Sequence, residues 1–400
     1  MGWTTQICGM PGRQGAPHNR CVPPTTLTPL AVERVTRDVD CLSRAGLCVD
    51  EFFAEVLDSL GRVLPTEGAC VATADPATGL VTSSRKYGGL VHRNTHDHEW
   101  GLREFGDVEE TTFVRMTETG RVAASVHQVT GGDVAASRRM AEFMRPYFGF
   151  DDELRGLFLE DGRCWGAVAM FRGDGDHFTP GEVDLLAVLS PFLARGVRSG
   201  LLASAAEVLP GERPHGPGVV IVGRDGEVLQ MSLGAETWIE ELVTGAHSGA
   251  AISAVSALVG AARRYAAGET TTPPRSRLRA RNGMWLVLNA TPLTGPDGLT
   301  DQVVVTIEEA RPPEIVPLVV AAFDLTARER DVTQLVLQGV DTKEIAATLH
   351  LSTYTVQDHL KAVFTKADVR SRRELVSRVF FDQYQPRFGE EVGVNGWYVS

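Results

Sequence analysis

The chain has 400 residues, of which 43% are hydrophobic and 22% charged, and its formal net charge is −12. This length predicts two to four domains. The acidity excludes a surface that coats nucleic acid as a whole, although it allows a local site. No apolar run approaches the roughly 20 residues needed to cross a bilayer, so we expect no membrane contact. The six cysteines form no CxxC pair, which indicates reduced thiols in a cytoplasmic protein.

The first half of the chain predicts a sensor-like α+β unit. Residues 1–26 are rich in Gly, Pro and polar side chains, and we expect them to be disordered. Over 27–205, two amphipathic helical patterns, a hairpin, a polar middle, a second hairpin and a long helix follow one another. Thr179 and Glu182 predict the start of that helix as a capping box. This order resembles GAF domains, most clearly in "DGRCWGAVAMFRGDGDHFTPGEVDLL".

A second unit follows a Pro/Gly-rich linker at 209–218. Residues 216–310 show a hairpin with an Asp-Gly turn, two helical patterns and three more strands, with Asn-Gly at a turn. This pattern resembles PAS domains. The stretch "RPPEIVP" that comes next is predicted to be a linker, because its prolines interrupt any regular pattern.

Consecutive helix starts mark residues 323–381. Thr326 and Glu329 form a capping box, and Ser352 and Ser371 stand where they cap later helices. The helix before Ser352 is joined to the helix after it by the tight turn "HLS". Two short helices joined in this way make a helix-turn-helix, whose second helix enters the DNA major groove. Within 350–380 there are six basic and three acidic residues, a local net charge of +3.

Residues 323–380 resemble the LuxR/GerE-type helix-turn-helix family. Apolar periodicity alone does not explain the interleaved Glu, Lys and His identities. The resemblance implies an all-α four-helix domain, double-stranded DNA as a partner and a homodimer formed through the fourth helix. The residues that carry it are Leu325, Thr326, Arg328, Glu329, Gly339, Lys343, Glu344, Ile345, Ala346, Leu349, Ser352, Thr355, Val356, His359, Lys366, Val369, Ser371 and Arg372.

The helix after Ser352 has a polar face opposite its apolar one. Gln357, Asp358 and Lys361 lie there within one turn of each other. Glutamine suits adenine, aspartate suits cytosine and lysine suits guanine, and the family's base-reading residues match these positions. Phosphate contacts, which position the protein without specifying sequence, are expected from Lys343, Tyr354, Thr355, His359 and Lys366.

Two of these positions leave other interpretations open. Gln357 stands where the family usually has lysine, and Asp358 would repel phosphate, so both weaken nonspecific affinity for DNA. One alternative is a degenerate helix-turn-helix that no longer binds DNA and serves as a docking module for another protein. A blander alternative is a core-packed helix with a solvated polar face.

The remaining sequence predicts no reaction chemistry. His92, His96 and His98 lie in "HRNTHDHE", where a spacing of four could place two of them on one metal. We expect a polar loop there, because helix caps are missing, and we assign no metal. Neither a Ser/His/Asp set nor paired carboxylates have a convincing context, so we expect no enzyme, and the cofactor is unassigned.

The prediction as a whole is a multidomain protein. Two α+β sensor domains, GAF-like and then PAS-like, precede an all-α LuxR-type domain and a tail at 382–400. The predicted function is a DNA-binding transcription regulator controlled by a signal that the sensor domains receive. RNA polymerase and a small-molecule ligand are further candidate partners.

Overall fold

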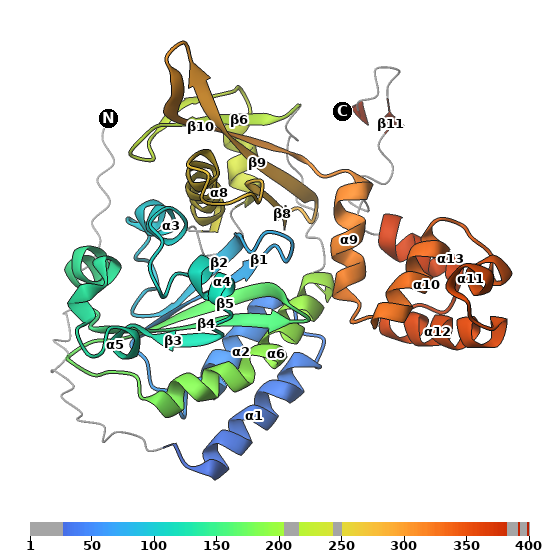
Figure 1. The fold of residues 1–400 in the computed structure, drawn as a ribbon, viewed down its shortest axis with the longest axis horizontal. Coiled ribbons are helices and arrows are strands. Elements are labelled where there is room, and N and C mark those ends of the chain that lie inside the picture. Colours follow the sequence, from blue (N-terminus) through green and yellow to red (C-terminus); the bar gives the residue numbers. More distant parts are fainter. Residues whose placement is uncertain (1–26, 204–215, 243–249, 382–390, 393–397, 400) are drawn as a thin grey trace, which may run out of the picture.

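The computed structural model describes residues 27–203, 216–242, 250–381, 391–392 and 398–399. Two sheet domains lie against each other, and a helical domain stands to one side (Figure 1). The predicted fold class, two α+β domains followed by an all-α domain, is confirmed. The N-terminal segment 1–26, most of the predicted linker at 209–218 and most of the tail at 382–400 lie outside the described residues.

The first domain is a five-stranded antiparallel sheet in the order β2-β1-β5-β4-β3. Helices α1, α2 and α6 cover one face, and α3 and α4 lie over the other (Figure 1). Both predicted hairpins are formed, as β1–β2 and β4–β5. The elements are α1 (Pro29–Ser43), α2 (Val49–Gly61), β1 (Gly68–Ala74), β2 (Val81–Gly88), α3 (Asp97–Phe105), α4 (Phe113–Thr119), β3 (Ala123–Ser125), α5 (Val126–Val129), η1 (Val134–Ala136), η2 (Met140–Phe148), β4 (Asp152–Glu160), β5 (Arg163–Arg172) and α6 (Pro180–Ala203).

Helix α6 is the central helix of this domain. It begins as predicted: the Thr179 backbone N–H donates to the Glu182 carboxylate at 2.7 Å, and Pro180 takes the first helical position. By length and composition α6 is apolar enough to cross a membrane. However, twelve of its residues are buried, and it packs on β4 and α1. Its apolar character is therefore explained by the protein core.

The second domain repeats the strand order of the first. Its five antiparallel strands are arranged β7-β6-β10-β9-β8, so each sheet places its second, first, fifth, fourth and third strands side by side. Helix α8 packs on β9 and β10. The elements are β6 (Gly218–Val222), β7 (Val228–Met231), α7 (Ala235–Leu242), α8 (Ala250–Ala266), β8 (Arg275–Arg279), β9 (Trp285–Gly295) and β10 (Gly298–Glu309).

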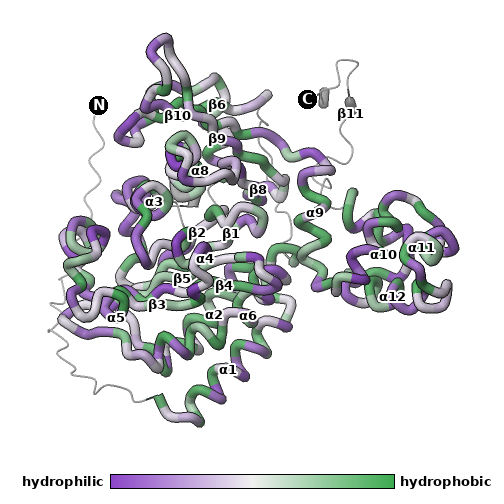
Figure 2. The backbone as a smooth tube through the Cα atoms, viewed as in Figure 1, coloured by the Kyte–Doolittle hydropathy of each residue, from purple (hydrophilic) through white to green (hydrophobic). Residues whose placement is uncertain are grey.

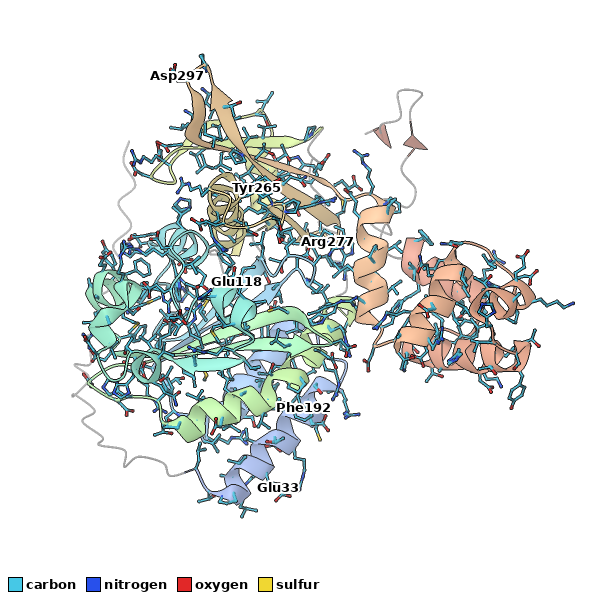
Figure 3. The ribbon with its side chains drawn as sticks, in the orientation of Figure 1. Glu33, Glu118, Phe192, Tyr265, Arg277 and Asp297 are labelled. Atoms are coloured by element: carbon cyan, nitrogen blue, oxygen red, sulfur yellow. The ribbon has the colours of Figure 1, made fainter. Side chains whose placement is uncertain are left out.

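The two sheet domains are tied together by a buried ion pair. The Arg277 guanidinium on β8 donates to both carboxylate oxygens of Asp75, at 2.8 and 2.6 Å, and the Asp75 side chain is only 2% exposed. Arg277 is labelled in Figure 3, on the second sheet domain. The Arg277 backbone N–H adds a third donor at 2.9 Å. Asp75 follows β1 of the first sheet, so the pair links the two sheets directly.

Helices α3 and α8 form the second link, and glycines let them approach closely. A Cβ on Gly101 would lie 2.5 Å from the Cβ of Ser256, and one on Gly260 would lie 2.9 Å from the backbone nitrogen of Gly106. His98 Nδ1 lies 2.6 Å from the Ser256 hydroxyl. A larger side chain at Gly101 or Gly260 would have to push the helices apart.

Two local expectations were wrong. The stretch "RPPEIVP" is not a linker but the start of α9 (Pro312–Ala322), an apolar helix (Figure 2). Its prolines at the first two helical positions cost no hydrogen bond, and the Arg311 N–H donates to Glu314 at 2.6 Å. Similarly, His98 lies within α3 and His96 at its N-cap position, because Trp100 and Phe105 bury that helix on the sheet.

The C-terminal domain is helical, as predicted. It contains α10 (Ala327–Leu337), α11 (Thr342–Leu349), α12 (Thr353–Lys366) and α13 (Arg372–Val376), and the chain continues as a short π-helix, η3 (Ser377–Phe381). A continuous apolar core runs from α2 and α6 through Ile315 and Leu318 of α9 into this domain. Strands β11 (Glu391–Val392) and β12 (Tyr398–Val399) pair with each other.

Candidate nucleic-acid interface and a buried pocket

Local hydrogen bonds fix each helix start of the C-terminal domain. The Thr326 backbone N–H donates to the Glu329 carboxylate at 2.7 Å, and the Glu329 N–H donates back to the Thr326 hydroxyl at 3.3 Å. The hydroxyls of Ser352 and Ser371 accept backbone N–H groups three residues later, at 3.0 and 3.2 Å. His350 ends α11 in the left-handed region with a φ of 55°, which turns the chain sharply into α12.

The polar face of α12 is open to solvent. Val356, Leu360 and Val363 are buried, and the opposite side exposes Gln357, Asp358 and Lys361. The structure therefore brings the three predicted base-reading residues together in one patch. The Lys361 ammonium lies 3.3 Å from the Asp358 carboxylate, and both side chains are well exposed. A pair this exposed is worth at most about 1 kcal/mol, so DNA bases can compete for either partner.

The residues predicted to contact phosphate differ in their surroundings. Lys343 is exposed on α11, and Tyr354 is 71% exposed at the start of α12. Thr355 is half-buried, and its hydroxyl lies 2.8 Å from that of Ser352. His359 is half-buried as well. The first two are therefore the most accessible of the predicted contacts.

Lys366 has a structural partner that the sequence did not reveal. Its ammonium donates to the Glu329 carboxylate at 2.7 Å and so ties α12 to α10. Burial favours the neutral form of Glu329, but the Lys366 ammonium and the Thr326 backbone outweigh it and hold the pKa of Glu329 below its ordinary value. Lys366 could contact phosphate only through the ammonium N–H groups that do not donate to Glu329.

The arginines after α12 supply further positive charge. Arg370 and Arg373 are exposed, whereas the Arg372 guanidinium donates to the Val340 carbonyl and so joins α13 to the loop before α11. Arg370, Arg373 and Lys343 are therefore exposed cations of this domain.

This geometry defines a helix-turn-helix domain of the DNA-binding class. Residues 324–379 match the family model described as "Bacterial regulatory proteins, luxR family". The chain is 42% identical over 52 residues to the spore germination protein GerE of Bacillus subtilis, a match that covers 13% of this chain and 70% of GerE. The chain therefore belongs to the luxR family of bacterial regulatory proteins.

Longer relatives match over the same short length. The monoamine regulon transcriptional regulator of Klebsiella aerogenes is 43% identical over 61 residues, which are 15% of this chain and 27% of that protein. The chain thus spans about a quarter of that relative. Among solved structures, the nlh2 gaf domain of A. Aeolicus is 14% identical; the match covers 42% of this chain and 95% of that one, with a TM-score of 0.27. A likeness that distant bears on neither ligand nor function.

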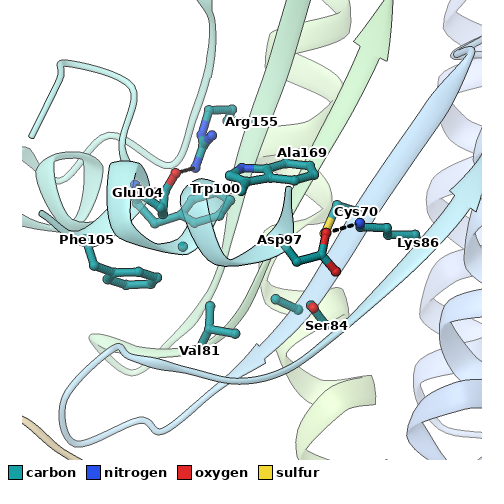
Figure 4. Close-up of a pocket in the computed structure, with 13 residues that line it drawn as sticks. Cys70, Val81, Ser84, Lys86, Asp97, Trp100, Glu104, Phe105, Arg155 and Ala169 are labelled. Atoms are coloured by element: carbon teal, nitrogen blue, oxygen red, sulfur yellow. Dashed lines mark hydrogen bonds and ion pairs between the residues drawn. The ribbon is translucent and has the colours of Figure 1, made fainter. Parts of the chain in front are cut away.

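The first domain contains a buried pocket that the sequence did not predict. It lies between the sheet and α3 (Figure 4). Trp100 and Phe105 of α3 and Phe113 of α4 supply aromatic walls, and Cys70 and Ala169 form part of the floor on β1 and β5. The sequence shows only the spacing of the aromatic residues in this domain. That spacing does not distinguish a core side chain from one that lines a cavity.

Six charged side chains lie in or behind this pocket. The Lys86 ammonium pairs with Asp97, and it also donates to the Arg93 carbonyl at 2.6 Å. Arg155 donates to Glu104 and to Glu153, at 2.6 Å each. Behind them, Arg139 donates to Glu153 at 2.7 Å. These residues come from distant parts of the chain, so no local motif could have revealed the cluster.

The charges of the cluster are stabilised by their neighbours. Burial opposes ionisation of Glu153, but Arg139 and Arg155 outweigh it and lower the pKa of Glu153. Burial raises the pKa of Asp97, while the hydrogen bond from Lys86 opposes that shift. Among the described residues, no three His, Cys, Asp or Glu side chains gather as a metal site would require. The three histidines of this stretch do not converge. The His96 ring stacks on Tyr147, and the His98 ring is hydrogen-bonded to Ser256. His92 lies before α3, in the left-handed region with a φ of 64°.

Proposed function

We propose that this protein is a cytoplasmic, sequence-specific DNA-binding transcription regulator that acts as a homodimer and responds to a signal received by its two N-terminal domains. The observation that carries the proposal is the exposed patch of Gln357, Asp358 and Lys361 on α12 of a luxR-family domain. In this account α12 lies in the major groove, where these side chains reach base edges. The accessible Lys343 and Tyr354 hold the phosphate backbone.

Contacts between the domains supply the route for the signal. The Arg198 guanidinium of α6 forms ion pairs with Asp324, at 3.0 Å, and with Glu160, at 2.6 Å, so the first domain holds the entrance to α10. Arg330 of α10 lies 3.7 Å from Asp161, at the β4–β5 turn. A ligand that favours one arrangement of these contacts would shift the paired DNA-binding domains by its differential affinity, typically about 1–3 kcal/mol. RNA polymerase is the partner that such a regulator would address once bound.

Salt dependence of binding to a mixed-sequence duplex tests the proposal. Phosphate contacts release counterions, so log K falls with log[salt] by about 0.9 for each contact. We expect a steep slope for the full chain and a slope shallower by about 0.9 for Lys343→Ala. Arg224→Ala serves as the matched control, because Arg224 is 79% exposed on the second sheet domain, away from α12. No binding, or a flat slope, would contradict the proposal and favour a docking module instead.

A further inference from the structure

Two buried polar atoms in the pocket of the first domain have no hydrogen-bond partner. These are the second carboxylate oxygen of Asp97 and the Nε–H of Arg155. Asp97 is 3% exposed and Arg155 is fully buried, and both line the pocket. An unsatisfied buried polar atom costs about 1–3 kcal/mol. The pocket therefore offers one free acceptor and one free donor to a molecule that enters it.

The charges around the pocket already balance. Lys86 neutralises Asp97, and Arg139 and Arg155 neutralise Glu104 and Glu153. A ligand with its own net charge would enter a buried site without a counterion and would carry the desolvation penalty of an unpaired charge. The balance therefore selects an uncharged ligand. The aromatic walls, Trp100, Phe105 and Phe113, suit a flat ring.

The cavity is smaller than a ring requires. Its volume is about 60 Å³, against the ~150 Å³ of an engineered apolar cavity that takes up benzene. A ring-sized ligand must therefore move part of the wall. The sheet floor is held by strand pairing on both sides of β1, whereas the wall is α3, a helix of nine residues that carries Asp97 and Trp100. Helix α3 also packs on α8, where Gly101, which lines the pocket, meets Ser256.

We propose that this pocket binds a small uncharged aromatic molecule that donates a hydrogen bond to Asp97 and accepts one from Arg155, and that its entry displaces α3 against α8. The inference rests on the proposed sensory role and names its ligand class. The close packing of α3 on α8 carries the displacement into the second domain, because neither helix has a flexible side chain at Gly101 or Gly260 to absorb it.

The test compares three molecules of the same shape but different charge: benzamide, benzoate and benzamidine. Benzamide is neutral and carries both a donor and an acceptor. Saturation-transfer NMR on the full chain, without DNA, measures the affinity for each. We expect benzamide to bind at least tenfold more tightly than benzoate or benzamidine. Ala169→Leu, which fills the pocket, should abolish this binding, whereas Val188→Leu on the exposed surface of α6 should not change it.

Two charge-changing variants keep the proposal open to refutation if Ala169→Leu fails to fold. Asp97→Asn leaves the pocket with one excess positive charge and should make benzoate the preferred ligand. Lys86→Met leaves one excess negative charge and should make benzamidine preferred. A role of Asp97 and Lys86 in folding alone would lower all three affinities without reversing their order. Equal or tighter binding of the charged molecules to the unmodified chain would overturn the ligand class.

Amide hydrogen exchange tests the displacement. Saturating benzamide should change the exchange rates of α8 as well as those of α3, and unchanged rates in α8 would overturn the coupling. These outcomes are independent of the proposed function, because neither measurement uses DNA. If the chain binds benzamide preferentially but does not bind DNA, the proposed regulator function is refuted. If the chain binds DNA but shows no preference for benzamide, the proposed ligand class is refuted.

Discussion

The ion pair between Asp75 and Arg277 offers the sharpest test of how the two sheet domains are joined. Arg277→Ala removes the two guanidinium donors that hold the Asp75 carboxylate, together with a 3.0 Å hydrogen bond to the Glu314 carbonyl at the start of α9. Asp75 stays buried and loses its counterion. Breaking a buried pair from one side typically costs about 3–5 kcal/mol.

This cost can be measured by urea unfolding of the full chain. With a denaturant slope of about 3 kcal/mol per M, the midpoint of the transition should fall by roughly 1–1.7 M. Arg277→Lys should recover only part of the loss, because an ammonium cannot bind both carboxylate oxygens as the planar guanidinium does. The midpoint can be followed by tryptophan fluorescence, since both domains contain buried tryptophans, Trp100 and Trp165 in the first and Trp238 and Trp285 in the second.

Arg224→Ala is the matched control for this experiment. Arg224 lies 3.8 Å from Asp301, and their side chains are 79% and 70% exposed, so its removal should change the stability by less than about 0.5 kcal/mol. If Arg277→Ala moved the midpoint no more than Arg224→Ala, the Asp75 pair would not hold the two sheet domains together, and the close packing of α3 on α8 would remain as the link between them.

Three further predictions concern single side chains. Asp358→Ala should weaken binding to the preferred DNA site by about 1–3 kcal/mol, because a base contact is lost. The same change should strengthen binding to mixed-sequence duplex, because phosphate repulsion is relieved. If a titration showed stronger binding to both duplexes, Asp358 would read no base. The folded-state pKa of Glu329 is lowered from about 4.5, so its stabilisation is present above that pH and is lost as the pH falls through the folded value. Melting temperatures of the unmodified chain and Glu329→Gln should therefore differ at neutral pH and converge as the pH falls from about 4.5 through the folded value, and a constant difference would argue against the ion pair. Burial raises the pKa of Cys164 to about 11, so a thiol reagent at about pH 8 should label the exposed Cys41 and spare Cys164 until the chain unfolds, as peptide mass spectrometry would show.

The sequence predicted features that depend on nearby residues. The caps at Thr326, Ser352 and Ser371 involve groups within four positions of each other, so their spacing alone specifies the helix starts. The exposed side of α12 follows in the same way from its 3.6-residue period once Val356 and Leu360 are placed inside.

Features that depend on tertiary contacts were missed. The α9 helix was mistaken for a linker, because its prolines were weighed as helix breakers without the packing of Ile315 and Leu318. The pairing of Lys366 with Glu329 joins positions 37 residues apart. The pocket charges, such as Arg155 and Glu104, are separated by 51 residues and become neighbours only when the sheet forms.

The central claim is that the patch on α12 reads DNA sequence, and selection from genomic fragments tests it most directly. The purified full chain is mixed with fragments of bacterial DNA, and the bound fraction is sequenced at two salt concentrations, in parallel with Lys361→Ala. We expect enrichment of an inverted repeat by the unmodified chain, weaker at high salt and lost with Lys361→Ala. Absence of any enriched sequence, or the same enriched sequence with Lys361→Ala, would contradict the central claim.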